Sequence, residues 1–248
     1  AELVIHTASP FKVQGIKDPQ TELVDPALKG TKHVLEAVNA SGTVKRVVLT
    51  SSVVAIYGDA IELEETENNV FTEKHWNTTS SLQHQPYNYS KTVAEKEGWR
   101  MQAEQDRWDL LVVNPGFVMG PSLTRRADST SIDMMRQIAS GKLKMGVPEL
   151  NFGVVDVRDV AMAHILAGTN KTANGRHILV NTSMSMLEIA NEVKKHVNQP
   201  KNVPGKYLPK MMLYLFGPFM GFYWRYIRNN VGKALAFDNT DSKKDLGL

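Results

Sequence analysis

The chain has 248 residues, of which 42% are hydrophobic and 22% are charged, values typical of a globular protein with one large domain or a domain and an added lobe. Its net charge of +3, from 29 basic and 26 acidic residues, is too small to indicate nucleic-acid binding. Cysteine is absent, which excludes disulfides and thiolate chemistry, and no apolar run reaches about 18 residues, so we expect no membrane-spanning helix.

Short apolar runs alternate along the chain with segments of helical periodicity. The predicted strands are residues 3–7, 47–49, 110–113, 152–157 and 177–180, and the predicted helices are residues 21–41, 87 to about 107, 131–140, 158 to about 168, 186–196 and 207–228. Residues 61–86 are polar and loop-like, and so long a loop in a compact domain is typically functional. Strands alternating with helices predict an α/β fold, a Rossmann-like doubly wound parallel sheet with a small C-terminal lobe.

Small and hydroxyl residues follow three of the predicted strands. The strand ends are Thr7-Ala8-Ser9, Thr50-Ser51-Ser52 and Asn114-Pro115-Gly116. In open α/β sheets a ligand lies outside the carboxyl ends of the strands. These ends therefore fit a flat ligand lying over the edge of the sheet.

Tyr87 and Lys91 stand four residues apart at the start of a predicted helix, so their side chains share one face. An ammonium group beside a phenol favours the phenolate, and we expect Lys91 to lower the pKa of Tyr87 from about 10. The pair then supplies a proton donor and acceptor usable near neutral pH. The spacing alone fits an ordinary surface helix equally well, and the neighbouring strand ends favour the catalytic interpretation.

Taken in chain order, these motifs resemble the extended short-chain dehydrogenase/reductases of the NAD-dependent epimerase/dehydratase family. The resemblance is greatest to the branch of dihydroflavonol reductase-like, cinnamoyl-CoA reductase-like and aldehyde or methylglyoxal reductases. The segments that carry it are residues 4–10, 46–52, 87–91, 114–121 and 155–161.

The resemblance implies that a carbonyl compound (an aldehyde, a ketone or a dihydroflavonol-like molecule) is reduced to an alcohol by NADPH, with NAD(H) as the alternative cofactor. By the same resemblance, Ser52 hydrogen-bonds the substrate carbonyl, Tyr87 donates a proton to the developing alkoxide, and Lys91 holds the ribose hydroxyls. The implied cofactor contacts are Thr7, Ala8, Ser9, Thr50, Ser51, Tyr87, Lys91, Pro115, Gly116 and Val118.

The expected organisation is a cofactor-binding domain of residues 1–116 and about 152–170, and a substrate-binding lobe of about 117–151 and 171–248. One departure from the family pattern is that no G-x-x-G-x-x-G motif occurs. Those glycines let backbone amides approach the pyrophosphate. We therefore expect the N-terminal strands of the cofactor domain to be missing from this chain, and the chain by itself to bind cofactor weakly.

Two other functions remain open on the sequence. One is a nucleotide-sugar epimerase or dehydratase of the same fold, and the other is a non-catalytic nucleotide-sensing or partner-binding protein, which the missing glycine motif would explain. The seven histidines lack metal-ligand spacing, so no metal site is expected. The expected partner is a small-molecule carbonyl substrate, and we expect no binding to nucleic acid or to a membrane. The protein is expected to be a cytoplasmic monomer or homodimer.

Overall fold

The computed structural model describes residues 1–11, 15–123 and 129–247, and within them the strands form two sheets. The larger sheet is parallel, in the order β1 (Leu3–His6), β2 (Arg46–Thr50), β3 (Asp109–Pro115) and β6 (Gly175–Leu179). The smaller sheet has the order β4 (Phe117–Met119), β5 (Asn151–Asp156) and β7 (Thr182–Ser185), with β7 antiparallel to β5.

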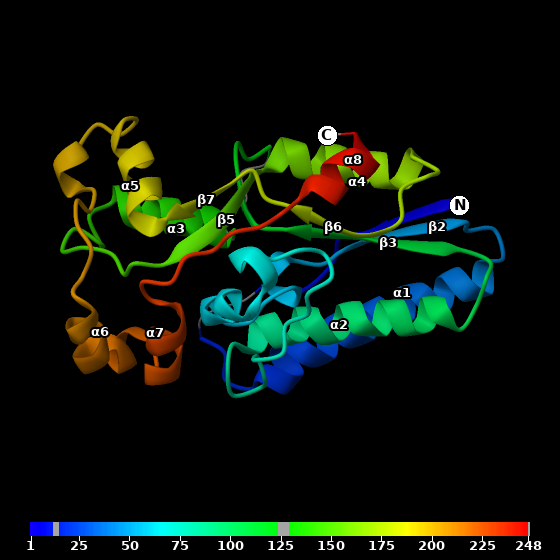
Figure 1. Ribbon diagram of the computed structural model, residues 1–248, viewed down its shortest axis with the longest axis horizontal. Helices are drawn as coiled ribbons and strands as arrows, with labels where there is room; N and C mark the ends of the chain where they lie inside the picture. The colour runs from blue at the N-terminus through cyan, green and yellow to red at the C-terminus, as the bar shows by residue number, and fades with distance from the viewer. Residues whose placement is uncertain (12–14, 124–128, 248) are drawn as a thin grey trace.

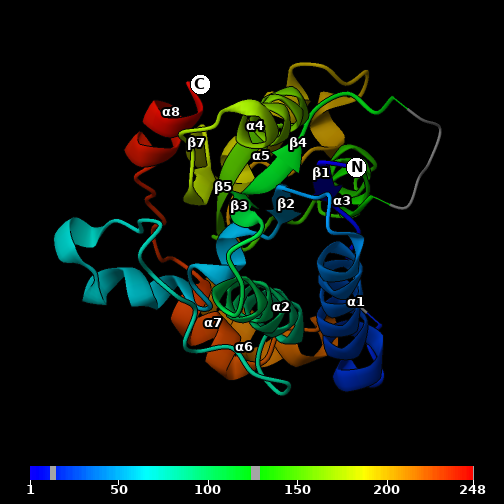
Figure 2. The ribbon, with the colours of Figure 1, turned by 90° about the vertical axis from the view of Figure 1, so that its right-hand side faces the viewer.

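Helices cover both faces of the larger sheet (Figures 1 and 2). On one face, α1 (Asp25–Ser41) and α2 (Pro86–Ala103) lie side by side, and on the other lie α4 (Val157–Thr169) and α8 (Thr240–Leu246). The predicted α/β, Rossmann-like fold is therefore confirmed. No helix in the described part of the chain is both long and apolar enough to span a bilayer.

The apolar runs in β2 and β3 explain this layering. Successive side chains of a strand point to opposite faces of the sheet. Val47 and Leu49 of β2 accordingly pack with Leu35 of α1, whereas Val48 packs with Ala163 of α4. Both faces of these strands are buried, which is why they read as continuous apolar runs rather than as alternating ones.

The smaller sheet carries the helices α3 (Thr130–Ala139) and α5 (Met186–Lys194). The two sheets divide the strands in a way that differs from the expected domain boundaries. Strand β5, expected in the cofactor-binding part, pairs with β4 and β7, whereas β6, expected in the lobe, pairs with β3. The helix α4 that follows β5 does pack on the larger sheet.

Two helical predictions differ from the structure in length. Helix α2 ends at Ala103 rather than near Arg107. The aromatic region 207–228 is not one helix but two short ones, α6 (Lys210–Phe216) and α7 (Trp224–Asn230). Between them Pro218 lies in a 3₁₀ turn and Gly221 has a φ of 85°, a left-handed conformation that ends the turn.

Candidate active site

The carboxyl ends of β1 and β2 and one face of α2 enclose a small cavity. Its volume is about 10 Å³, room for roughly one water molecule. The predicted residues among its lining are Ala8, Ser9, Thr50, Ser51 and Lys91, and they are joined by His6, Thr31, Leu49, Ala94 and Glu95. The structure therefore brings together four of the nine strand-end residues that the sequence singled out, with Lys91 beside them.

Lys91 is buried on the inner face of α2. Its Nζ donates to the carbonyl oxygen of Thr50 at 3.4 Å, the one hydrogen bond of this ammonium group within the described residues. Burial lowers the pKa of Lys91 to about 8, and the charge of Glu95 acts in the opposite direction. The pKa of His6 is lowered too, by burial first and by the charge of Lys91 second. An ammonium has three donors, so Lys91 retains N–H groups for a ligand.

Tyr87 lies one helical turn before Lys91, and its ring packs edge-on against Phe11 with ring centroids 4.8 Å apart. Among the described residues its hydroxyl group forms no hydrogen bond, to Ser52 or to Lys91. Burial raises the pKa of Tyr87 well above its ordinary value. The prediction that Lys91 lowers this pKa is wrong for this structure, because the cost of burying the phenolate sets the direction of the shift.

Ser52 links the ends of β2 and β3. Its Oγ donates to the carbonyl oxygen of Pro115 at 3.3 Å and accepts from the N–H of Val54, also at 3.3 Å. It thereby caps a 3₁₀ turn, Val53–Ala55. The hydroxyl is half-buried and already partnered by backbone groups, as strand-end hydroxyls often are.

The other predicted cofactor contacts are placed less uniformly. Thr7 is exposed just beyond β1. The hydroxyl of Thr50 lies 2.6 Å from Nε2 of His164, whose Nδ1 lies 2.7 Å from a backbone carbonyl oxygen. Since a carbonyl only accepts, Nδ1 carries the proton and Thr50 donates to Nε2. Gly116 connects β3 to β4 and Val118 lies within β4, and neither lines the small cavity.

A buried carboxylate that the sequence analysis missed, Glu95, lies under the strand ends. It accepts from Asn114 Nδ2 at 2.9 Å, from Trp99 Nε1 at 3.3 Å and from the hydroxyl of Ser51. It also accepts from Arg176 Nε at 2.6 Å. The sequence did carry a signal, because Glu95 continues the four-residue step of the predicted tyrosine and lysine along one face of the helix.

Arg176 of β6 connects this carboxylate to the long loop. Its guanidinium donates to the backbone carbonyls of Glu73, His75 and Ala55 and lies 3.9 Å from the ring centroid of Trp76. The loop also borders a second cavity of about 170 Å³, lined by Ile56, Glu62, Glu65, Thr66, Phe71, His75, Trp76 and Thr78. In the described ranges, no group of three or more potential ligand side chains is arranged to hold a metal ion.

Comparison with known proteins places this geometry in context. Residues 1–181 match the model of the NAD dependent epimerase/dehydratase family. The chain is 39% identical over 180 residues to a cinnamoyl-CoA reductase of Medicago truncatula, covering 71% of this chain and 53% of the relative. It is 34% identical over 209 residues to the NADPH-dependent methylglyoxal reductase of Saccharomyces cerevisiae, covering 77% of this chain and 60% of the relative.

The fold agrees with these matches. The crystal structure of Gre2 from Candida albicans in complex with NADPH superposes with a TM-score of 0.77 at 30% identity, and the match covers 100% of this chain and 72% of the other. The present chain therefore spans between about half and three fifths of the length of the first curated relatives it matches.

Proposed function

The chain belongs to the NAD dependent epimerase/dehydratase family, and on that premise we propose that the protein is a carbonyl reductase that uses NADPH, with NAD(H) as the alternative. The observation that carries the proposal is the buried Lys91, which lies beside Ala8, Ser9 and Thr50 with Tyr87 one helical turn before it. Two similar proteins are named as reductases, and one similar structure holds NADPH, which supports both the reaction and the cofactor.

The residues present fit the nicotinamide and ribose end of such a cofactor. Lys91 keeps N–H groups that can donate to ribose hydroxyls, and the small side chains of Ala8 and Ser9 line the cavity beside it. We also propose Thr7, Thr50, Ser51, Pro115, Gly116 and Val118 as cofactor contacts. The sequence contains no glycine motif for the pyrophosphate, so no residues of this chain are assigned to it.

When bound, the reduced nicotinamide supplies the hydride. The roles left to the protein are to polarise the carbonyl and to deliver a proton. Ser52 and Tyr87 are the hydroxyl donors assigned to the carbonyl oxygen, where negative charge grows. The phenol of Tyr87 holds its proton at neutral pH, and although its raised pKa makes it a weaker acid, the developing alkoxide is a strong enough base to take that proton. With a pKa of about 8, Lys91 is mostly charged at neutral pH, and its positive charge favours the phenolate that Tyr87 becomes when it gives up its proton.

The arrangement of the chain supports a division of labour. We assign residues 1–116 and about 152–170 to cofactor binding, and about 117–151 and 171–248 to the substrate lobe, with β5 and β6 as the strands that pair across this boundary. Exposed aromatic residues such as Tyr223 and Trp224 in that lobe suit an apolar or flat carbonyl compound. The absence of cysteine supports a cytoplasmic location, and a monomer or homodimer is the proposed assembly.

The test follows NADPH absorbance in the full-length protein with aromatic aldehydes, methylglyoxal and dihydroflavonols. We expect Tyr87→Phe to lose roughly 100- to 10,000-fold in rate because it removes the proton donor. Lys91→Ala should also lose most of the rate. Tyr89→Phe is the matched control, since it removes a phenol hydroxyl two residues away that forms no hydrogen bond within the described residues.

Wild-type rate in Tyr87→Phe would rule out the proposed mechanism. Turnover of a sugar nucleotide without net oxidation of cofactor would instead favour an epimerase or dehydratase. Tight binding of NADPH with no oxidation across the carbonyl panel would favour a nucleotide-sensing protein.

A further inference from the structure

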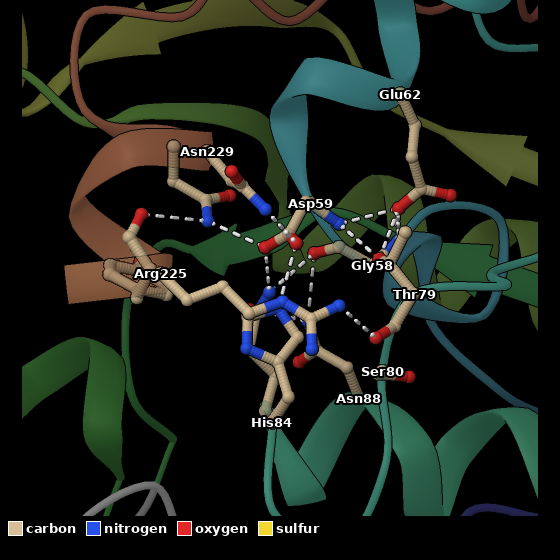
Figure 3. A network of polar contacts seen from close by, with 12 residues as sticks. Gly58, Asp59, Glu62, Thr79, Ser80, His84, Asn88, Arg225 and Asn229 are labelled. Atoms are coloured by element: carbon tan, nitrogen blue, oxygen red, sulfur yellow. Dashed lines mark hydrogen bonds and ion pairs between the residues drawn. The ribbon is translucent and has the colours of Figure 1, made fainter. Parts of the chain in front are cut away.

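A second buried carboxylate, Asp59, lies beside the N-terminus of α2. It is fully buried, and four side chains donate to its two oxygens (Figure 3). Oδ1 accepts from Gln85 Nε2 and Asn230 Nδ2, each at 2.7 Å, and Oδ2 accepts from His84 Nε2 at 2.7 Å and Asn229 Nδ2 at 2.8 Å. The donors come from the residues just before α2 and from α7, so one carboxylate joins two segments that lie far apart in the sequence.

A chain of hydrogen bonds extends this contact to Tyr223, which directly precedes α7. Because His84 Nε2 donates to Asp59, His84 Nδ1 can accept from the hydroxyl of Tyr223, whose oxygen lies 2.9 Å away. The same phenol oxygen accepts from the backbone N–H of Gln85 at 3.0 Å. Asp59, His84 and Tyr223 therefore form a continuous path that ends on the backbone of Gln85.

Gln85 has a left-handed backbone, with φ 53° and ψ 60°, which is unfavourable for a residue with a Cβ. Its polar groups are held by the surrounding structure. The side chain donates to Gly58 O at 2.8 Å and accepts from Asn88 Nδ2 at 2.8 Å, and its carbonyl accepts from the N–H of Tyr89 at 3.1 Å. Strained residues of this kind persist only where several contacts fix them, and they gather at functional sites.

The strained residue stands two positions before Tyr87, with only Pro86 between them. The conformation of Gln85 sets the direction in which α2 begins, and hence where the phenol of Tyr87 is carried. We propose that Asp59, His84 and Tyr223 are positioning residues: they hold Gln85 in its left-handed conformation and thereby fix Tyr87 for proton transfer. The C-terminal lobe would then control the geometry of a catalytic group through Tyr223.

Tyr223 offers the sharpest variant, because its side chain is 38% exposed and its ring can remain in place. Tyr223→Phe removes the acceptor for the Gln85 N–H and the donor to His84. We expect kcat to fall about tenfold to a hundredfold. The KM values for cofactor and carbonyl compound should change by less than about threefold, since the loss falls on the transition state. Tyr89→Phe, which also removes a phenol hydroxyl near Tyr87, should change neither.

The kinetic measurement rests on the proposed function, so a second measurement is independent of it. In protein isotopically labelled at its tyrosine rings, the ring signals of Tyr87 are identified by their loss in Tyr87→Phe. These signals report the ring current of Phe11, which packs against Tyr87. Tyr223→Phe should shift them and should speed amide exchange at Gln85, whereas a loss of stability elsewhere leaves the native ring signals unchanged.

The outcomes separate the two ideas. If the wild-type protein reduces no carbonyl compound, the proposed function fails, and the ring signals and the Gln85 amide still decide the positioning role. Unchanged Tyr87 signals and unchanged Gln85 exchange in Tyr223→Phe would overturn the inference, as would a loss confined to KM. Should Tyr223→Phe fold poorly, His84→Gln breaks the same path from the other side and is judged by the same two measurements.

Discussion

Replacing Glu95 with alanine is expected to lower the free energy of unfolding by about 4 kcal/mol. The side chains of Glu95 and Arg176 are 0% and 7% exposed, so the variant leaves a guanidinium charge in the interior without its counter-charge. Removing one partner of a buried pair costs about 3–5 kcal/mol. Arg176 keeps its backbone carbonyl acceptors, which argues for the lower end of that range. The unpaired donors of Ser51 and Asn114 add about 1 kcal/mol or more.

The assay is urea unfolding followed by tryptophan fluorescence, with linear extrapolation to water. The matched control is Glu104→Ala at the end of the same helix. The side chains of Glu104 and its partner Arg100 are 63% and 52% exposed, and an exposed pair of this kind is worth less than about 1 kcal/mol. The contrast between two glutamate-to-alanine changes isolates burial as the cause.

A double variant tests whether the uncompensated charge is the source of the cost. Glu95→Leu with Arg176→Met removes both charges, so it should cost less than the sum of the two single variants by more than about 1 kcal/mol. A cost below about 1 kcal/mol for Glu95→Ala, or simple additivity in the double variant, would refute this account of the buried pair.

Three further predictions concern stability. The pKa of Lys91 is about 8 in the folded protein, below the ordinary lysine value of 10.5 that applies to the unfolded chain. Between these two pH values the unfolded chain binds more protons, so the free energy of unfolding rises with pH. Lys91→Met should lack that rise when urea unfolding is measured at successive pH values. Gly116→Ala should lower the free energy of unfolding by more than about 2 kcal/mol, because the new Cβ would lie 2.1 Å from the carbonyl oxygen of Gly153. Gly30→Ala lies in a helix with open space around it and should raise the free energy of unfolding by about 0.5–1 kcal/mol in the same assay. Ser185→Ala removes an N-cap and should lower the thermal midpoint by an amount equivalent to about 1 kcal/mol.

The strands of the larger sheet and the long helices could be predicted because the local pattern of apolar residues indicates which of their side chains are buried. In the smaller sheet only β5 could be predicted in this way. Strands β4 and β7 have three and four residues, too few to show a period, and they exist because both pair with β5. The break between α6 and α7 was signalled by Pro218 and Gly221 but was hidden inside an apolar, aromatic run.

The candidate site was predictable to the extent that spacing and strand ends determine it. Lys91 and the residues after β1 and β2 were singled out in this way, and Lys91 lines one cavity with Ala8, Ser9, Thr50 and Ser51. The direction of the Tyr87 pKa shift could not be predicted, because spacing shows which groups are near each other but not how far each is removed from water. Glu95 and Arg176 are 81 residues apart, and their pairing needs the sheet to be assembled first.

The two buried carboxylates, Asp59 and Glu95, explain how α2 is held in place. Its inward face carries polar residues rather than the usual apolar ones, including Lys91 and Glu95. Such a face is stable only if each group finds a partner. Asp59 fixes the segment before the helix through Gln85 and through Asn229 of α7. Glu95 fixes the helix two turns after Tyr87 through Arg176 of β6. The segment that carries Tyr87 and Lys91 is thus held at both ends by charge-assisted hydrogen bonds, and a buried polar network whose members are satisfied makes such a segment rigid.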